Sequence, residues 1–226
     1  MRLVLLHALP LDGRMWDATR PPSRGAFVPT LYGLGGSVRD WAAAVLEKCG
    51  DDELLVVGSS VGGSCALEVA RAAPDQVRGV VLVGVKAGVR RDPRARDEAV
   101  RFLRHHGVAA AWDRYWAPLF SAQADPEVVS AARKLALEQD VADLITGVRA
   151  FYGRRDHSEF ARTWGGQLLV VSGAEDRTPT PATAASSVGG TRARQVIVEG
   201  SGHYVPLEQP HVLHRAIEKQ LRILQA

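Results

Sequence analysis

Three residues whose types suit nucleophilic catalysis occur along the chain in the order Ser60, Asp176 and His203. Ser60 is the central residue of "GSSVG", and this is the one frame within residues 56–64 that fits the pattern Gly-x-Ser-x-Gly. A serine hydroxyl attacks a carbonyl carbon efficiently only when a base removes its proton, and that base is usually oriented by a carboxylate. The three residue types together therefore predict acyl transfer at an ester-like carbonyl group.

The segment around Ser60 predicts a strand that passes directly into a helix. The apolar run "ELLVVG" (53–58) is typical of a buried strand, and "SVGGSCALEVARAA" (60–73) has a helical pattern. A serine at such a turn is held in a strained backbone conformation, with its hydroxyl above the carboxyl end of the sheet. The glycines within the turn let strand and helix approach closely. The pattern favours a nucleophile over a glycine-rich turn with a purely structural role.

The expected base and carboxylate also follow strand-like segments. Asp176 comes three residues after Gly173, where the run "QLLVVSG" (167–173) ends, and His203 lies in a glycine-rich loop after the next apolar run. Glu175 is an alternative acid because it adjoins Asp176, although the Gly-x-x-Asp spacing favours Asp176. We expect the three side chains to meet because the carboxyl ends of parallel strands share one edge of a sheet.

Short apolar runs alternate with helical patterns along most of the chain, which is typical of an α/β fold with a mostly parallel sheet and helices on both faces. The helix expected over 37–50 has a capping box at its start and a glycine at its end. Strands are expected over residues 2–6, 26–31, 53–58, 77–84, 167–173 and 194–200.

Residues 86–166 break this alternation, since they contain helical patterns and no strand-like run. An all-helical insertion between two strands is expected at the edge of the sheet or over its top. Within it, Trp112, Tyr115 and Trp116 are spaced to share one face of a helix. Such a stripe forms either the core of the insertion or a wall of a substrate pocket, and both interpretations favour an apolar pocket.

The composition excludes several classes of function. The chain has 226 residues, of which 46% are hydrophobic and 23% are charged, with a formal net charge of +3. These values fit one globular domain, and the net positive charge is too small to indicate nucleic-acid binding. The basic run from Lys86 to Arg96 could attract an acidic substrate, but it is interpreted here as a solvated surface. Cys49 and Cys65 fit no metal or redox spacing, and no apolar run suits a membrane span, so a cytoplasmic protein without metal or cofactor is expected.

Taken jointly, four motifs resemble those of the α/β-hydrolase fold superfamily, in particular its small esterases, lactonases and haloperoxidase-like members. These motifs are "LLHALPLDGRMW", "VVGSSVGGS", "VVSGAEDRTPTP" and "EGSGHYVPLEQP". The order serine, aspartate, histidine is also that of α/β-hydrolases. The resemblance implies a hydrolase core formed by residues 1–85 and 167–226, with residues 86–166 as a helical cap. It also implies a sheet that lacks the family's one or two N-terminal strands, because the chain begins at the strand before the first motif.

The resemblance further implies an oxyanion hole made of two backbone N–H groups, those of Leu9 and Val61. Ala8 stands where the family usually has glycine, which leaves the geometry of this loop open. His7 is expected to tie the loop by hydrogen bonds, and Asp12 to be structural or to line the pocket.

Three functions are compatible with these residues. The first is a serine hydrolase that cleaves a carboxylic ester or lactone of a small, largely apolar molecule through an acyl-enzyme. The second is a C–C lyase or elimination enzyme, as in the menaquinone-pathway synthases of the same superfamily. The third is a ligand-binding receptor with little turnover. The oligomeric state is left open.

Overall fold

The computed structural model describes residues 1–19, 25–89, 92–189 and 193–225. Its strands form one sheet in the order β2-β1-β3-β4-β5-β6, and each neighbouring pair is parallel. The strands are β1 (Arg2–Leu6), β2 (Ala26–Phe27), β3 (Leu54–Ser59), β4 (Val77–Val83), β5 (Gln167–Gly173) and β6 (Ala193–Val198). The expected parallel α/β architecture is therefore confirmed, and five of the six expected strands end within two residues of the positions expected.

The exception is the second strand, which was expected over 26–31 and covers only Ala26–Phe27. Its later residues instead lead into a short 3₁₀ helix, η2 (Leu31–Leu34). Pro29 follows directly after Val28, and proline has no N–H to donate to a neighbouring strand. The ladder therefore stops early at this edge of the sheet.

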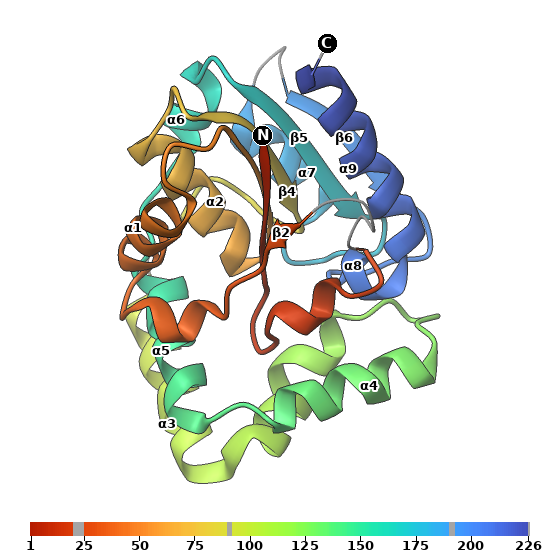
Figure 1. Ribbon diagram of the computed structural model, residues 1–226. Helices are drawn as coiled ribbons and strands as arrows, with labels where there is room; N and C mark the ends of the chain where they lie inside the picture. The colour runs from red at the N-terminus through yellow and green to blue at the C-terminus, as the bar shows by residue number, and fades with distance from the viewer. Residues whose placement is uncertain (20–24, 90–91, 190–192, 226) are drawn as a thin grey trace.

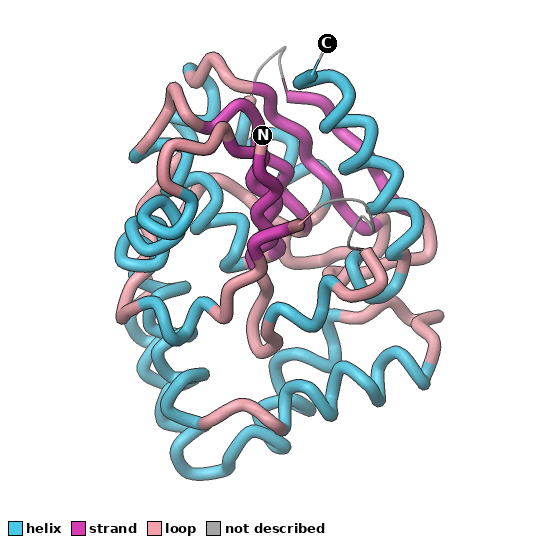
Figure 2. The backbone as a smooth tube through the Cα atoms, in the orientation of Figure 1, coloured by secondary structure: helices cyan, strands magenta, loops and turns pink. Residues whose placement is uncertain are grey.

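Helices cover both faces of the sheet, which occupies the middle of the molecule (Figures 1 and 2). The helix α9 packs on β4 and β5, while α2 packs on β1, β3 and β4 from the other side and contacts α1. As expected, Ser37 caps α1, because its Oγ accepts a hydrogen bond from the N–H of Asp40 at 3.2 Å. The helices outside the insertion are α1 (Val38–Cys49), α2 (Val61–Ala72), α7 (Pro181–Val188), α8 (Val205–Glu208) and α9 (Pro210–Gln225).

Between β4 and β5 the described residues contain helices and no strand. These are α3 (Pro93–Ala111), the π-helical turn η3 (Trp112–Trp116), the 3₁₀ turn η4 (Ala117–Leu119), α4 (Pro126–Leu137), α5 (Val141–Gly153) and α6 (Ser158–Thr163). The segments from α3 to α5, residues 93–153, lie beyond the carboxyl ends of the strands, at the bottom of Figure 1, and are called the helical layer below. In contrast, α6 packs on α7 of the sheet region.

The helical layer departs from the sequence expectation at its aromatic stripe. Trp112, Tyr115 and Trp116 were expected on one face of an α-helix, but Trp112–Trp116 is a π-helical turn. The residues therefore do not follow the regular α-helical spacing that the expectation assumed. Gly107, at φ 74°, also kinks α3 just before this turn.

The core is built from the branched apolar side chains of the inner strands. All six residues of β3 are buried, as are the last four residues of β1 and the last five of β4. Burying one such side chain stabilises the fold by about 1.5–3 kcal/mol relative to leaving it exposed. No helix among the described residues is both long and apolar enough to cross a membrane, and no cluster of three or more His, Cys, Asp or Glu there could hold a metal ion.

Candidate active site

Ser60 occupies the turn between β3 and α2 with φ 53° and ψ −118°. It is the single non-glycine residue with positive φ in the described ranges. Such a conformation costs about 1–3 kcal/mol and persists only where the surroundings enforce it. Glycine is required on both sides of it, because a Cβ atom at Gly58 would lie 2.3 Å from the carbonyl oxygen of Gly62, and one at Gly62 would lie 2.3 Å from that of Leu6.

The turn places its two serines in different environments. Ser59 is fully buried, and its hydroxyl has no hydrogen-bond partner among the described residues. Ser60 is partly exposed and lines a cavity between the sheet and the helical layer. The hydroxyl that faces this cavity is therefore the one that the Gly-x-Ser-x-Gly frame selects.

His203 and Asp176 form a buried pair at the same edge of the sheet. The Nδ1 atom of His203 lies 2.9 Å from Oδ2 of Asp176, and the two residues are only 4% and 3% exposed. A carboxylate can only accept, so Nδ1 donates and Nε2 is left as an acceptor. The second carboxylate oxygen of Asp176 accepts the N–H of Thr178 at 2.8 Å, which fixes the orientation of the carboxylate.

Glu175 has a different partner. Its carboxylate accepts a hydrogen bond from the backbone N–H of Ala122 at 3.0 Å, and the residue is exposed. It thus connects the loop after β5 to the helical layer, while Asp176 contacts the imidazole. Of the two acids that the sequence left as alternatives, Asp176 is the one next to His203.

The loop that carries His203 is held by contacts that its sequence does not predict. The N–H of His203 donates to the carbonyl oxygen of Leu119 at 2.8 Å. The carboxylate of Glu208 accepts the N–H of Gly202 at 3.0 Å and the N–H of Ser121 at 2.9 Å. The histidine loop and the turn 119–121 of the helical layer are therefore joined through hydrogen bonds to backbone groups.

His7 organises the loop after β1, as expected from the sequence. Its Nε2 accepts the N–H of Leu31 at 2.8 Å, so its Nδ1 carries the proton and donates to the carbonyl oxygen of Ala8 at 3.2 Å. Complete burial lowers the pKa of His7 to about 4, against the weaker opposing effects of Ala8 and Asp12. The imidazole is therefore neutral at physiological pH. Ala8 is fully buried without positive φ, so alanine fits this loop without backbone strain.

The sequence expected two hydrogen-bond donors at Leu9 and Val61. Leu9 lines the cavity, and Val61 is the first residue of α2, directly after Ser60. No described residue accepts a hydrogen bond from either of the two backbone N–H groups. The carbonyl oxygen of Leu9 accepts the phenolic hydroxyl of buried Tyr204 at 2.9 Å, which fixes the peptide that follows Leu9.

Asp12 is structural, in line with one of the two roles expected for it. Its carboxylate caps η1 (Gly13–Trp16) by accepting the N–H of Arg14 at 3.0 Å. It also accepts hydrogen bonds from the guanidinium of Arg14 and from Nε2 of Gln139. Burial alone would raise the pKa of Asp12, but the hydrogen bonds from Arg14 and Gln139 outweigh it and hold that pKa below its ordinary value. Asp12 is not among the residues that line the cavity.

The cavity that contains Ser60 and His203 has a volume of about 630 Å³. Its walls come from both the sheet edge and the helical layer. Of the three residues considered for a pocket wall, Tyr115 and Trp116 line the cavity and Trp112 does not. Trp112 is 1% exposed and packs with Phe120 inside the helical layer. The stripe is thus divided between the two roles that the sequence left open, with Trp112 in the core of the helical layer and the other two residues in the cavity wall.

The cavity wall is apolar in large part but also contains four cationic residues, which are Lys86, Arg114, Arg154 and Arg177. No aspartate or glutamate among the described residues lines it. Lys86 corrects a sequence interpretation, because the run from Lys86 to Arg96 was expected to be a solvated surface. Lys86 is instead half-buried in the cavity wall, because it lies in the short segment after β4 that lines the cavity together with Gly84 and Val85. Arg90 and Arg91 of that run lie outside the described residues.

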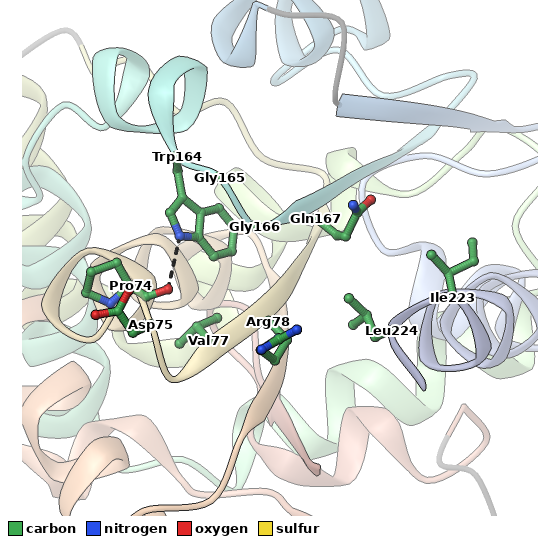
Figure 3. A pocket seen from close by; sticks show the side chains of 10 residues that line it. All are labelled: Pro74, Asp75, Val77, Arg78, Trp164, Gly165, Gly166, Gln167, Ile223 and Leu224. Carbon is green, nitrogen blue, oxygen red and sulfur yellow. Dashed lines mark hydrogen bonds between the residues drawn. The ribbon is translucent and has the colours of Figure 1, made fainter. Parts of the chain in front are cut away.

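A second pocket, of about 560 Å³, lies at the opposite edge of the sheet, where β4 and β5 begin (Figure 3). Trp164 stands against its wall, and its indole N–H donates to the carbonyl oxygen of Pro74 at 3.4 Å. Among the described residues, Asp75 and Arg78 are the charged ones in its lining, and no described serine, histidine or cysteine lines it. Its described residues therefore include no hydroxyl or thiol nucleophile and no imidazole base.

A parallel sheet with a serine elbow and a His–Asp pair at its carboxyl edge defines an α/β-hydrolase. Comparison with known proteins agrees, since the sequence profile of the Alpha/beta hydrolase family matches residues 3–216. The chain belongs to this family. The family assignment and the expected α/β-hydrolase fold are thus confirmed.

Two curated relatives are similar over part of the chain. Lipase LipV of Mycobacterium tuberculosis is 35% identical over 96 residues, and the pimeloyl-[acyl-carrier protein] methyl ester esterase of Aromatoleum aromaticum is 36% identical over 91 residues. Each match spans 36% of this chain and 36% of the relative.

Solved structures resemble the chain over its whole length. A thermophilic esterase from Thermogutta terrifontis, with malate bound, has a TM-score of 0.90 and 23% identity, covering 100% of this chain and 91% of that one. The enol-lactonase of Burkholderia xenovorans LB400 has a TM-score of 0.84 and 19% identity, covering 97% and 90%. At these identities the likeness establishes the fold.

Sequence reasoning missed three residues of the site: Tyr204, Glu208 and Arg154. The first two lie next to or near His203 in a quoted motif, but each bonds a backbone group far away in the chain, at Leu9 and Ser121, which no local pattern reveals. Arg154 follows α5 in a helical region and carries no motif. Its burial marks it as a candidate site residue, but the sequence does not predict that an arginine at a helix end is buried.

Proposed function

We propose that this protein is a serine hydrolase that cleaves a carboxylic ester or a lactone of a small, largely apolar substrate. Ser60 is the nucleophile, His203 the general base and Asp176 the residue that orients it. Residues 86–166 act as a cap over the site. The observation that carries the proposal is that Ser60 and His203 line one cavity, with His203 bonded to Asp176 at 2.9 Å.

The reaction follows from the geometry of these groups. Ser60 Oγ attacks the ester carbonyl carbon while its proton passes to Nε2 of His203, and the carbonyl oxygen becomes an oxyanion. The free N–H groups of Leu9 and Val61 stabilise that charge, each by about 3 kcal/mol in the transition state. The C–O bond to the leaving alcohol then breaks as His203 returns the proton to it, which leaves Ser60 acylated.

Deacylation repeats these steps with water. His203 takes a proton from water as the hydroxide attacks the acyl carbon, and the proton then returns to Ser60 as the carboxylic acid leaves. With a lactone the alcohol and the acid remain in one molecule, so the product is a hydroxy acid. The reaction requires no metal or cofactor. The names of the two curated relatives, a lipase and a methyl ester esterase, support ester hydrolysis.

The two adjacent serines provide a matched test. The protein is treated with a fluorophosphonate probe and assayed with p-nitrophenyl esters of graded acyl length, as wild type, Ser60→Ala and Ser59→Ala. We expect Ser60→Ala to lose both labelling and turnover. Ser59→Ala should retain both, because the Ser59 side chain is buried away from the cavity and makes no hydrogen bond with described residues.

Other outcomes separate the rival functions. An adduct on Ser59 would overturn the assignment of the nucleophile. Labelling of Ser60 without turnover of any ester or lactone would favour the lyase or elimination reaction. Absence of labelling together with retained ligand binding would favour a receptor.

A further inference from the structure

Arg154 is a buried cation in the wall of the Ser60 cavity. It directly follows α5, is 9% exposed and lines the cavity. Its guanidinium lies over the ring of Phe151, 3.7 Å from the ring centre, and its Nη1 donates to the carbonyl oxygen of Phe151. None of the described carboxylates forms an ion pair with it.

A desolvated charge of this kind is unfavourable without a partner. Burying an unpaired ion costs several kcal/mol unless hydrogen bonds or an opposite charge compensate. Burial lowers the pKa of Arg154 to about 10, which still leaves the guanidinium charged at neutral pH. A guanidinium has five N–H donors, and the hydrogen bond to Phe151 uses one of them. Most of its N–H donors therefore have no partner among the described residues.

The other cations of the cavity reinforce this charge. Lys86 and Arg177 form no ion pair with any described residue, whereas Arg114 is paired with Glu98 at 2.5 Å. Because the lining contains no acidic residue among those described, the potential inside the cavity is positive. This charge comes from three separate segments, which follow β4, α5 and β5.

We propose that the substrate of this site carries a free carboxylate, remote from the bond that is cleaved, and that Arg154 binds it. This inference rests on the proposed ester hydrolysis at Ser60 and specifies its substrate class. The planar guanidinium matches a carboxylate with two parallel hydrogen bonds, and one guanidinium balances its single charge. Leu103, Val148 and Ala99 in the same wall provide apolar contact for a hydrocarbon chain. The substrate class is thus the half-ester of an aliphatic dicarboxylic acid, or a lactone that bears a carboxylate.

The kinetic test compares esters that differ only in this charge. Monomethyl and dimethyl esters of dicarboxylic acids of graded length are assayed with wild type, Arg154→Met and Arg154→Lys. We expect wild type to prefer the monoester at one chain length. Arg154→Met should lose roughly 10- to 100-fold in kcat/KM for that monoester relative to the dimethyl ester, mainly through KM, because a charge-assisted hydrogen-bond pair is removed. Arg154→Lys should recover part of the loss.

The control is Arg104→Gln, an exposed arginine of α3 that is not in the cavity wall. This variant also removes one positive charge, but from the exposed surface of α3, and should leave the monoester preference unchanged. A wild-type protein that prefers dimethyl esters at every length, or an Arg154→Met variant that lowers both ester activities equally, would overturn the proposal.

A binding measurement separates this inference from the proposed reaction. Calorimetric titration with the dicarboxylates glutarate, adipate and pimelate is carried out on wild type, Ser60→Ala and Arg154→Met. Binding that persists in Ser60→Ala and is lost in Arg154→Met supports the carboxylate site even if no ester is hydrolysed. No binding to any of the three, or tighter binding of inorganic phosphate than of every dicarboxylate, would contradict it.

Discussion

The phenolic hydroxyl of Tyr204 donates a hydrogen bond of 2.9 Å to the carbonyl oxygen of Leu9. Tyr204 directly follows His203, so this bond joins the loop of the proposed base to the loop of the proposed oxyanion donor. Both groups are buried, and the hydroxyl has no access to water as an alternative partner. The bond therefore sets the distance between two parts of the site that belong to opposite ends of the chain.

Replacement of Tyr204 by Phe should lower kcat more than it changes KM. The lost hydroxyl leaves the carbonyl oxygen of Leu9 unpaired, at a cost of about 1–3 kcal/mol in the free energy of unfolding. It also loosens the Leu9 N–H, and small displacements of catalytic groups lower the rate steeply. Tyr32→Phe is the matched control, because its hydroxyl donates to the carbonyl of Leu11 at 2.8 Å, two residues further along the same loop. Equal losses of kcat in the two variants would show that Leu9 has no special role.

Asp176→Asn should fold normally, as measured by circular dichroism, and lose about 10⁴-fold in kcat, because the imidazole is no longer held in the required tautomer. Glu175→Gln is the comparison, since Glu175 contacts the N–H of Ala122 and not the imidazole. Its activity should stay close to that of wild type. If Glu175→Gln were the inactive variant, the assignment of the acid would have to be reversed.

The two tryptophans of the π turn should respond differently to truncation. Trp112→Ala removes a fully buried ring and should lower the free energy of unfolding by about 3–5 kcal/mol. Trp116→Ala removes a cavity wall and should change the ratio of kcat/KM between short and long acyl esters. Urea unfolding and an ester panel measure these effects. A change in acyl preference as large in Trp112→Ala as in Trp116→Ala would contradict this division.

Acid should destabilise the protein through His7. Its pKa is about 4 in the folded state and about 6.5 in the unfolded state. Between pH 4 and pH 6.5 the imidazole is therefore protonated in the unfolded chain and neutral in the folded chain. The stability that His7 contributes is present above pH 6.5 and is lost as the pH falls towards 4, at up to about 1.4 kcal/mol per pH unit. Urea titrations at several pH values should show a shallower decline for His7→Gln. Parallel curves for the two proteins would contradict the burial argument.

Strand positions could be predicted closely wherever a segment is buried on both faces. The run at 167–173 matches β5 at both ends, because continuous branched apolar residues have no alternative that buries them equally well. Residues 206–224 have one continuous hydrophobic helical pattern, but the structure forms two helices there, with Gln209 between them. Pro210 starts the second, and proline interrupts a helix that runs into it. The proline is visible in the sequence, but hydrophobic periodicity alone does not take its effect into account.

The candidate triad was predictable because each residue is marked locally, by glycines and by the end of an apolar run. The charge of the cavity was not, because Lys86, Arg154 and Arg177 come from separate segments, each of which resembles a polar surface when taken alone. Only the packing of the helical layer over the sheet edge brings them to one wall. A local sequence pattern therefore does not predict the positive charge of the cavity.

The hydrogen bonds between the histidine loop and the helical layer limit how this protein can be recombined with its relatives. Gly202 packs so closely against the helical layer that a Cβ atom there would lie 2.5 Å from the carbonyl oxygen of Leu119. The same carbonyl oxygen accepts the hydrogen bond from the N–H of His203. A chimera that exchanges the whole helical layer would replace that acceptor together with the substrate walls. An exchange of helical layers between relatives should therefore keep residues 119–122, whose hydrogen bonds hold the histidine loop, so that the proposed base stays in place while the substrate walls change.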